Sequence, residues 1–393
     1  MASILEFERY KTELNRQLLR RIGYTNGLHK IRRFARVVEY LYPVMPTSVG
    51  VLAQVIIQEE NKRPEEPGGS DRQLGGKKYA IGIIEVAQAL TLLEKFGTKI
   101  ALSSQGYACH ALNQQRDLRK PLDAFLFERI VQSDGECVLN ILRLINEGHT
   151  HFADIGETLM KRFLSLIEFK RKWAAANVND RFSQRTLSAL LDEAQRTLEK
   201  AIKPPVTGKS KVDFFYKHTV NPRLEWLSDL GCLDGDSGDL TATQEGKFVL
   251  EQIRVLGGWN ENFVFLPLDP WLTSELDLPG IYPSGADANF TWRLVAATHA
   301  SQPLPSQLLQ DSLSLLDKIK LIYPAVKLVN FNEADALSLY EVFAAMEAAE
   351  GRVLAHSEFE QSLKELVEKF PSEIFKLSKR RGRGLYVALK KFG

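Results

Sequence analysis

Two stretches of the sequence share the pattern that decides the fold: IIEVAQALTLLEKFGTKIALSSQGYACHAL, from Ile83 to Leu112, and PRLEWLSDLGCLDGDSGDLTATQEGKFVLEQI, from Pro222 to Ile253. In each, an apolar segment with helical spacing leads to a glycine and then to a short β-type segment. A Ser or Thr follows, with a second glycine three residues later and a second apolar segment of helical spacing. The pattern therefore predicts a helix, a hairpin and a closing helix at two places in the chain.

The residue types at four kinds of position in this pattern can be explained physically. Gly97 and Gly231 are expected to adopt the left-handed conformation that ends the first helix. In the first copy, apolar residues at helical spacing predict that this helix runs from about Tyr79 to Phe96. The closing helices are expected to be N-capped by Ser103 and Thr243, with Gly106 and Gly246 allowing close packing.

A third unit is predicted near the C-terminus. Helices are expected over Ala334–Ala349 and from Ser357, as N-cap, to Phe370, where Pro371 ends the pattern. Ile374–Leu377 and Leu385–Leu389 then predict the two strands of a hairpin, whose tip contains four basic residues and two glycines.

The chain is predicted to divide into five segments. These are basic N-terminal helices at 1–46, a first unit with a helical spacer at 47–148, a helical pair with the second unit at 149–256, a connecting segment rich in Pro and aromatic residues at 257–310, and a C-terminal unit at 311–393. Within the spacer, Ser133-Asp134-Gly135 is expected to separate two apolar helices. The connecting segment is interpreted as a packed linker, with docking of a partner as the alternative.

The two wing-like patterns resemble those of tandem winged helix-turn-helix proteins. Residues 50–253 are also similar in layout to the DNA-recognition part of type IIS restriction endonucleases, in which helical winged modules are joined by a helix pair. The resemblance implies a mostly α-helical, α+β array of two or three winged modules. It further implies a recognition subunit of a bacterial restriction, DNA-processing or phage-defence complex, with catalysis on separate protein chains.

Composition restricts how such a protein could bind nucleic acid. The net charge is only +2, so any contact with DNA must come from local basic patches. Cys109, Cys137 and Cys232 form no CxxC pair, so neither a disulfide framework nor a structural zinc is expected. No signal peptide or membrane-length apolar run is visible, which predicts a cytoplasmic protein without a membrane partner.

The predicted function is non-catalytic binding of duplex DNA without a cofactor, in company with protein subunits of a larger complex. Phosphate contacts are expected from the C-terminal hairpin tip and from the N-terminal basic cluster. Base contacts are expected from the polar face of the first helix. The candidate residues are Lys379, Arg380, Arg381 and Arg383 at the tip, Arg20, Arg21, Lys30, Arg32, Arg33 and Arg36 in the cluster, and Gln88 and Thr91 on the helix.

Two other classes of function stay open. Winged helices also dock proteins, and the acidic stretch Asp234–Asp239 favours a structural adaptor. Asp154, Glu168 and Lys170 mimic the carboxylates and lysine of a metal-dependent nuclease, but that function requires Glu168 and Lys170 on a strand, and their surroundings have helical spacing. His149 and His151 near Asp154 are interpreted as a polar turn rather than a metal site. Gly208-Lys209-Ser210 is rejected as a phosphate loop because Lys203 stands where the first glycine belongs.

Overall fold

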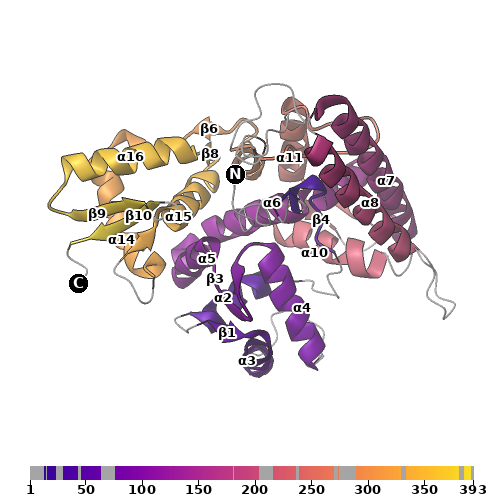
Figure 1. Ribbon diagram of the computed structural model, residues 1–393. Helices are drawn as coiled ribbons and strands as arrows, with labels where there is room; N and C mark the ends of the chain where they lie inside the picture. The colour runs from indigo at the N-terminus through magenta and orange to yellow at the C-terminus, as the bar shows by residue number, and fades with distance from the viewer. Residues whose placement is uncertain are drawn as a thin grey trace. The chain divides into compact units, whose positions relative to one another are not determined.

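The structure is a computed structural model of the 393-residue chain. It describes residues 13–14, 16–23, 30–42, 46–62, 76–179, 181–202, 216–235, 239–269, 273, 289–328, 333–379 and 385–390. The fold is mostly helical with small antiparallel sheets, as expected for the predicted α+β class (Figure 1). No helix in these ranges is long and apolar enough to cross a membrane.

The chain forms two compact units, and each is assembled from two separate stretches. Unit 1 consists of residues 1–29 and 130–301, and unit 2 of residues 30–129 and 302–393. The predicted segments follow one another along the chain, whereas the boundaries of the units fall inside three of them, namely 1–46, 47–148 and 257–310.

The first part of unit 2, here called the first module, begins with α2 (Arg32–Leu41), β1 (Thr47–Ser48) and α3 (Val49–Asn61). It continues with α4 (Gly76–Ala89), β2 (Leu93–Phe96), β3 (Lys99–Leu102) and α5 (Ser104–Gln114). The strands form an antiparallel sheet in the order β1-β3-β2. Ser48 caps α3 by accepting a hydrogen bond from Val51 N at 3.3 Å.

The C-terminal module of unit 2 repeats the order of elements. It consists of α14 (Ser312–Val326), β7 (Ala334–Asp335), α15 (Ala336–Ala348), α16 (His356–Lys369), β9 (Ile374–Lys379) and β10 (Leu385–Leu389). A short strand β8 (Arg352–Val353) between the last two helices pairs with β6 (Leu304–Pro305). The main sheet has the order β7-β10-β9, which matches that of the first module. The predicted hairpin of the C-terminal unit is therefore confirmed.

The closing helix α5 is the point at which the two modules of unit 2 pack together. It contacts α2 of its own module and both α14 and α15 of the C-terminal module. Ala108, Cys109 and Leu112 of α5 are buried, as is most of α15. Apolar burial on this scale makes the hydrophobic effect the main term that holds the modules together.

One local structure ends the first helix in both copies of the repeated pattern. Thr91 and Gly231 have φ values of 60° and 74°. The next residues, Leu92 and Cys232, donate backbone hydrogen bonds to Ala87 O at 2.9 Å and Leu227 O at 2.8 Å. These bonds satisfy carbonyls that a helix end otherwise leaves unpaired.

The repeated Ser or Thr and Gly complete this junction. Ser103 and Thr243 accept from Gly106 N at 2.9 Å and Gly246 N at 3.1 Å, so the predicted N-caps are confirmed. The same hydroxyls donate to the carbonyl oxygens of Thr91 and Gly231. Each hydroxyl therefore joins the end of the first helix to the start of the closing helix.

The predicted extent of the first helix is wrong for the first copy. Helix α4 ends at Ala89, and Leu93–Phe96 is strand β2. Thr91, not Gly97, takes the left-handed position after the helix, while Gly97, with φ 63°, lies in the turn between β2 and β3. Leu93 is buried, but as part of a β-sheet rather than of a helix. Its position matches the helical spacing of the residues before it by coincidence, so the spacing wrongly extended the helix.

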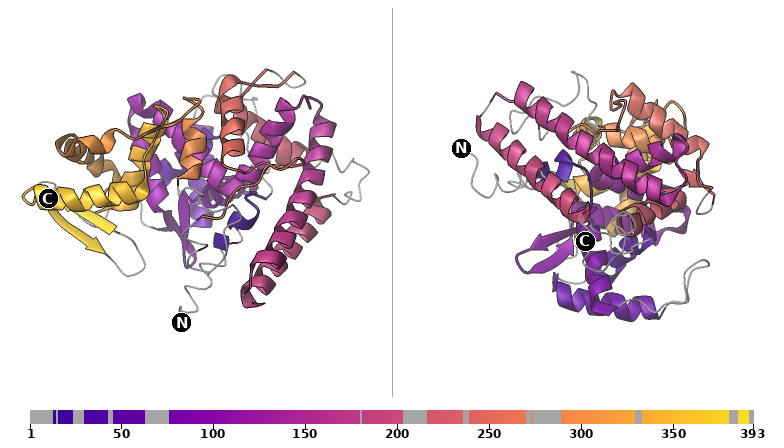
Figure 2. Two further views of the ribbon diagram at one scale, coloured as in Figure 1. Left: turned by 90° about the horizontal axis from the view of Figure 1, so that it is seen from above. Right: turned by 90° about the vertical axis from the view of Figure 1, so that its right-hand side faces the viewer.

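Unit 1 is built around the second half of α6 (Arg119–Asn146), with α7 (Phe152–Asn177) and α8 (Arg181–Ile202) side by side (Figure 2). These two helices confirm the helical pair predicted in the first part of segment 149–256. The second module follows, with α10 (Asn221–Asp229), β4 (Leu233–Asp234), β5 (Thr241–Ala242) and α11 (Gln244–Val255). Helix α13 (Phe290–Ala296) packs on α11.

The predicted break at Ser133-Asp134-Gly135 does not exist, because α6 is continuous from Arg119 to Asn146. Asp134 is fully buried and forms an ion pair with Arg223 of α10. A Cβ atom at Gly135 would lie 2.5 Å from Leu266 Cδ1, so the small residue lets the 263–268 segment approach the helix. Ser, Asp and Gly are common in turns, but in this helix Asp134 and Gly135 serve contacts with α10 and with the 263–268 segment.

The connecting segment packs as predicted over its described part. Phe263, Val264, Phe265, Leu266 and Leu268 are buried. Backbone groups of this segment pair with α6: Val264 N donates to Asn140 Oδ1 at 2.8 Å, and Leu266 N donates to Glu136 Oε1 at 2.9 Å. The interpretation as a packed linker is confirmed for these residues.

Candidate nucleic-acid interface

The first module exposes lysines on both its helix α4 and its hairpin. Lys77 and Lys78 lie in the first turn of α4, and Lys95 and Lys99 lie on β2 and β3. All four side chains are exposed, and within the described part of the chain they form no ion pair. Glu85 and Glu94 are the acidic residues exposed on the same elements. Four lysines against two glutamates give the exposed side chains of these elements a positive balance.

The two residues predicted to contact bases have different positions. Gln88 is on α4 and half-buried, next to exposed Glu85. Thr91 is not on the helix: its hydroxyl donates to Leu90 O at 2.7 Å and accepts from Arg129 Nη1 at 3.1 Å. The expected base contact by Thr91 is therefore corrected, because its side chain is bound within unit 2.

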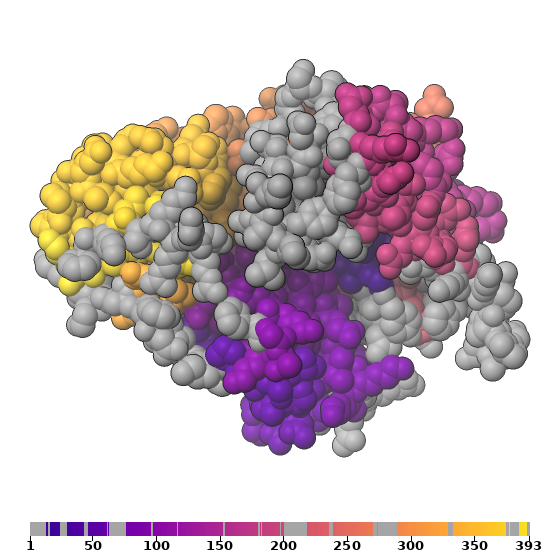
Figure 3. All heavy atoms as spheres, viewed as in Figure 1, coloured from indigo at the N-terminus to yellow at the C-terminus, as the bar shows by residue number. Residues whose placement is uncertain are grey.

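The helix that precedes the hairpin in the C-terminal module has the opposite charge balance. The exposed charged residues of α16 are Glu358, Lys364, Glu365, Glu368 and Lys369. Figure 3 shows this outer face, in yellow, at the surface. Three glutamates against two lysines would repel the phosphates that line a DNA groove.

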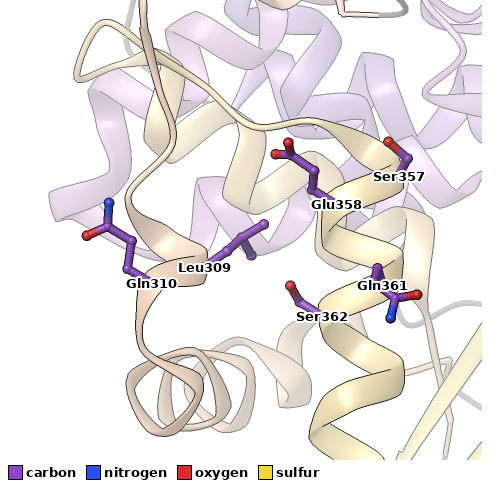
Figure 4. Close-up of a pocket in the computed structure, with 6 residues that line it drawn as sticks. All are labelled: Leu309, Gln310, Ser357, Glu358, Gln361 and Ser362. Carbon is purple, nitrogen blue, oxygen red and sulfur yellow. The ribbon is translucent and has the colours of Figure 1, made fainter.

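An open hollow of about 470 Å³ lies beside the first turns of α16. Leu309 and Gln310, from the short helix η3 (Leu308–Gln310), face Ser357, Glu358, Gln361 and Ser362 across it (Figure 4). Glu358 is the only charged group among the lining residues, and its sign is unfavourable for nucleic acid.

The C-terminal hairpin carries the strongest basic sequence of the chain. Lys379 ends β9 and pairs with Leu385 of β10. Arg380, Arg381 and Arg383 lie outside the described residues, in the segment that joins these two strands. The predicted role of these residues in DNA binding stays a prediction.

The N-terminal basic cluster does not form a single free patch, because Arg20 and Arg21 belong to unit 1 and the other four residues to unit 2. Arg20 has 0% exposed side-chain surface, and it donates to Gln132 O at 3.0 Å and to Pro267 O at 2.7 Å. The predicted DNA contact of Arg20 is corrected, since a group without exposed surface cannot reach a phosphate. Arg21 lies over the ring of Phe163, and burial lowers the pKa of its guanidinium.

The four cluster residues of unit 2 lie at or near α2. Arg32 pairs with Asp123 at 3.0 Å, and Arg36 pairs with the buried Glu60 at 2.9 Å. Arg33 lies 3.8 Å from the same Glu60, and Lys30 is half-buried. Ion pairs occupy these three arginines, and they connect α2 to α3 and to α6 within unit 2.

The second module has the least suitable surface for nucleic acid. Helix α10 buries Arg223, Leu224, Trp226 and Leu227 and exposes mainly Ser228 and Asp229. Exposed Asp234 and Asp239 flank its hairpin tip. Both the helix and the hairpin would therefore bring negative charge towards phosphates.

The nuclease-like residues do not form a metal site. Glu168 and Lys170 lie on helix α7, and Lys170 is fully buried against Glu136, with Nζ 2.5 Å from Oε1. Glu168 is exposed and pairs with Lys172 at 3.1 Å. His149 Nδ1 lies 2.5 Å from Asp154 Oδ2. Among the described residues, no group of three or more His, Cys, Asp or Glu side chains is placed to hold a metal ion.

Sequence reasoning missed Lys77, Lys78 and Lys99. The predicted helix begins at about Tyr79, whereas α4 begins at Gly76 and so contains the first two lysines, and Lys99 falls in a segment predicted only as β-type. The spacing of Ile83, Ala80 and Tyr79 extends one turn towards the N-terminus, and this signal could have placed both lysines on the helix.

Comparison of the chain with protein families, with curated proteins and with solved structures gave no match.

Proposed function

We propose that the chain is a non-catalytic DNA-binding protein whose first and C-terminal modules are winged helices. The observation that carries the proposal is the repeated order helix-strand-helix-helix-strand-strand, with the first strand paired to the last in both sheets. In a winged helix this order places the third helix and the hairpin on one side of the module, where DNA is usually bound.

In the first module, the proposed contact surface is the exposed side of α4 with the β2–β3 hairpin. The lysines named above supply phosphate contacts, and Gln88 is suited to a base contact by its amide group. Loss of counterions from DNA on binding these lysines would make the affinity strongly dependent on salt.

In the C-terminal module, the proposed contact is the hairpin rather than the helix. The outer face of α16 has an acidic balance, whereas the sequence between β9 and β10 contains Arg380, Arg381 and Arg383 and no acidic residue. Arginines on a hairpin can bind phosphates or enter a minor groove.

We further propose that the protein serves as the recognition subunit of a restriction, DNA-processing or phage-defence complex. The support for this part is the resemblance in layout to the recognition part of type IIS restriction endonucleases. A chain with basic DNA-contact surfaces on some modules and acidic surfaces on others can bind DNA and protein partners at once.

A structural adaptor is the second candidate function. It is favoured by the acidic outer face of α16 and by the exposed Asp234 and Asp239 of the second module. Leu313 and Leu321 on α14 are also exposed, by 55% and 69%. These features suit contact with proteins better than contact with DNA.

Salt-dependent binding of duplex DNA tests the proposal. Fluorescence anisotropy over a salt series should show an affinity that falls steeply with salt in the wild type. Because each lost phosphate contact reduces the slope of log affinity against log salt by about one, K95A/K99A should reduce it by about two and R380A/R381A/R383A by about three.

A control variant of matched charge is K161A/K172A, which removes two exposed lysines from α7 in unit 1. Its salt slope should equal that of the wild type. Weak, salt-independent binding by every form, together with a stoichiometric protein partner, would select the adaptor instead.

A further inference from the structure

A buried polar cluster connects the end of helix α4 to the C-terminal module within unit 2. Its centre is Arg129 of α6, which is 6% exposed. The guanidinium of Arg129 donates to Thr91 Oγ1 at 3.1 Å, pairs with its neighbour Glu128, and lies 3.3 Å from Glu341 Oε1 of α15. One side chain therefore contacts the first module and the C-terminal module at the same time.

Thr91 is an unusual residue for its position. It adopts a left-handed backbone conformation, which costs an ordinary L-residue about 1–2 kcal/mol and is rare for a β-branched one. The second module has Gly231 at the equivalent position, where the strain is absent. A glycine has no hydroxyl, so the strained threonine allows a hydrogen bond with Arg129 that the second module cannot form.

Thr91 also connects α4 to the hairpin. It lies between them, two residues after the end of α4 and two residues before the start of β2. Its carbonyl accepts from the Ser103 hydroxyl, which caps α5. The position of Thr91 therefore sets the angle between the helix and hairpin that carry the exposed lysines.

The cluster contains more acid than base. Glu341 is 4% exposed, and it faces Arg129 and Glu128 from α6, Gln105 from α5 and Asp335 from β7. Asp335 accepts a hydrogen bond from Ser104 of α5 and faces His356 of α16, which lies 4.0 Å from Glu360. Glu341 therefore lies in a buried site near two other buried carboxylates, and repulsion between like charges favours a proton on one of them near neutral pH.

Burial, together with the negative charges of Glu128 and Asp335, outweighs the lowering effects of Arg129 and Gln105 and raises the pKa of Glu341 to about 7. Burial likewise raises the pKa of Asp335 and lowers that of His356. Glu341 is therefore the carboxyl whose proton is exchanged in the physiological range.

We propose that Arg129 is a positioning residue for the DNA-contact surface of the first module, and that Glu341 of the C-terminal module regulates it through one proton. The inference rests on the proposed function for its biological meaning. Glu341 binds a proton more tightly when the cluster is closed and buried than when it opens to solvent. The free energy that keeps the cluster closed is therefore largest at low pH and is lost as the pH rises through 7.

Hydrogen exchange at the end of α4 tests this coupling without DNA. The amides of Leu90, Thr91 and Leu92 donate to Val86, Gln88 and Ala87 carbonyls, and their protection reports on this junction. After division by the intrinsic rate, wild-type protection should fall on the order of tenfold between pH 5.5 and 8. E341Q imitates the protonated acid and should keep its protection across that range.

A matched control is E347Q, which changes a buried glutamate of the same helix that pairs with Arg352 instead. Its protection should depend on pH as in the wild type. T91V keeps the β-branched shape but removes the hydroxyl that binds Arg129. Exchange protection at the end of α4 should then no longer depend on pH, whereas protection in α15, which carries Glu341, should still depend on it. A purely structural role for Thr91 would not separate the two helices in this way.

Equal pH dependence in E341Q and wild type, or none in the wild type, would overturn the inference. Measurement of the affinity for duplex DNA at pH 6 and at pH 8 then relates the coupling to function. The wild type should bind DNA more weakly at pH 8 than at pH 6, and E341Q should bind equally at both. If no form binds DNA but the exchange results are as expected, the proposed function is contradicted and the Arg129 coupling is retained.

Discussion

Asp134→Asn is expected to destabilise unit 1 by about 3–5 kcal/mol, because it leaves the charge of Arg223 buried without a counter-charge. Asp134 accepts from Arg223 Nε at 2.5 Å and Nη2 at 2.8 Å, and from Ile22 N at 2.6 Å. Burial opposes the charge on Arg223, but Asp134 outweighs it and raises the pKa of the guanidinium above its usual range. Removal of Asp134 takes this effect away, but a guanidinium stays protonated in proteins, so the variant leaves a buried charge without its partner.

Tryptophan fluorescence during urea unfolding measures this effect. All five tryptophans of the chain, at positions 173, 226, 259, 271 and 292, belong to unit 1, so their emission reports on that unit alone. The matched control is Asp192→Asn, which removes an exposed partner of Arg171 in the same unit and should change stability by less than about 0.5 kcal/mol. Equal stability of the two variants would contradict the buried ion pair.

Gly106→Ala is expected to destabilise unit 2 by about 3 kcal/mol or more. A Cβ atom there would lie 2.2 Å from the carbonyl oxygen of Leu92, a backbone atom that the strand and the helix end hold in place. Relief of the overlap requires separation of α5 from the end of α4, which would also break the Ser103 bridge.

Circular dichroism and fluorescence together locate this effect. Gly106→Ala should shift the loss of helical signal to lower urea, while the tryptophan transition, which reports on unit 1, stays in place. Gly135→Ala is the matched control within a helix: the one overlap of its Cβ, at 2.5 Å, would be with the end of the Leu266 side chain, which can rotate, so a smaller loss is expected. A loss from Gly106→Ala no greater than that from Gly135→Ala would contradict the close approach.

Local sequence signals predicted the caps, the hairpins and most helices because their causes are local. Ser103 and Thr243 cap helices through their own neighbours, and the spacing around α7 and α8 reflects one apolar face on each. The same signals failed at Leu93–Phe96 and at Ser133-Asp134-Gly135. At Leu93–Phe96, pairing with the adjacent strand β3 outweighs the helical spacing, and at Ser133-Asp134-Gly135 an ion pair with the distant Arg223 lies within a continuous helix.

The candidate site shows the same division. The basic character of the C-terminal hairpin is visible in the sequence, because consecutive residues carry it. The burial of Arg20 and the ion pairs of Arg32 and Arg36 are not visible, since Gln132, Asp123 and Glu60 are distant in sequence. Charge counted along the chain overestimates the basic surface wherever folding brings an acid or a carbonyl to each arginine.

The sequence by itself determined the repeated junction of helix, hairpin and closing helix, since Ser or Thr, Gly and the apolar spacing specify it within about thirty residues. Only the tertiary structure decided that residues 30–129 join the last ninety or so residues in one unit, and that Arg129 connects Thr91 to Glu341. Such pairings depend on the packing of complementary surfaces and on charge compensation between distant segments, and neither leaves a periodic trace in the sequence.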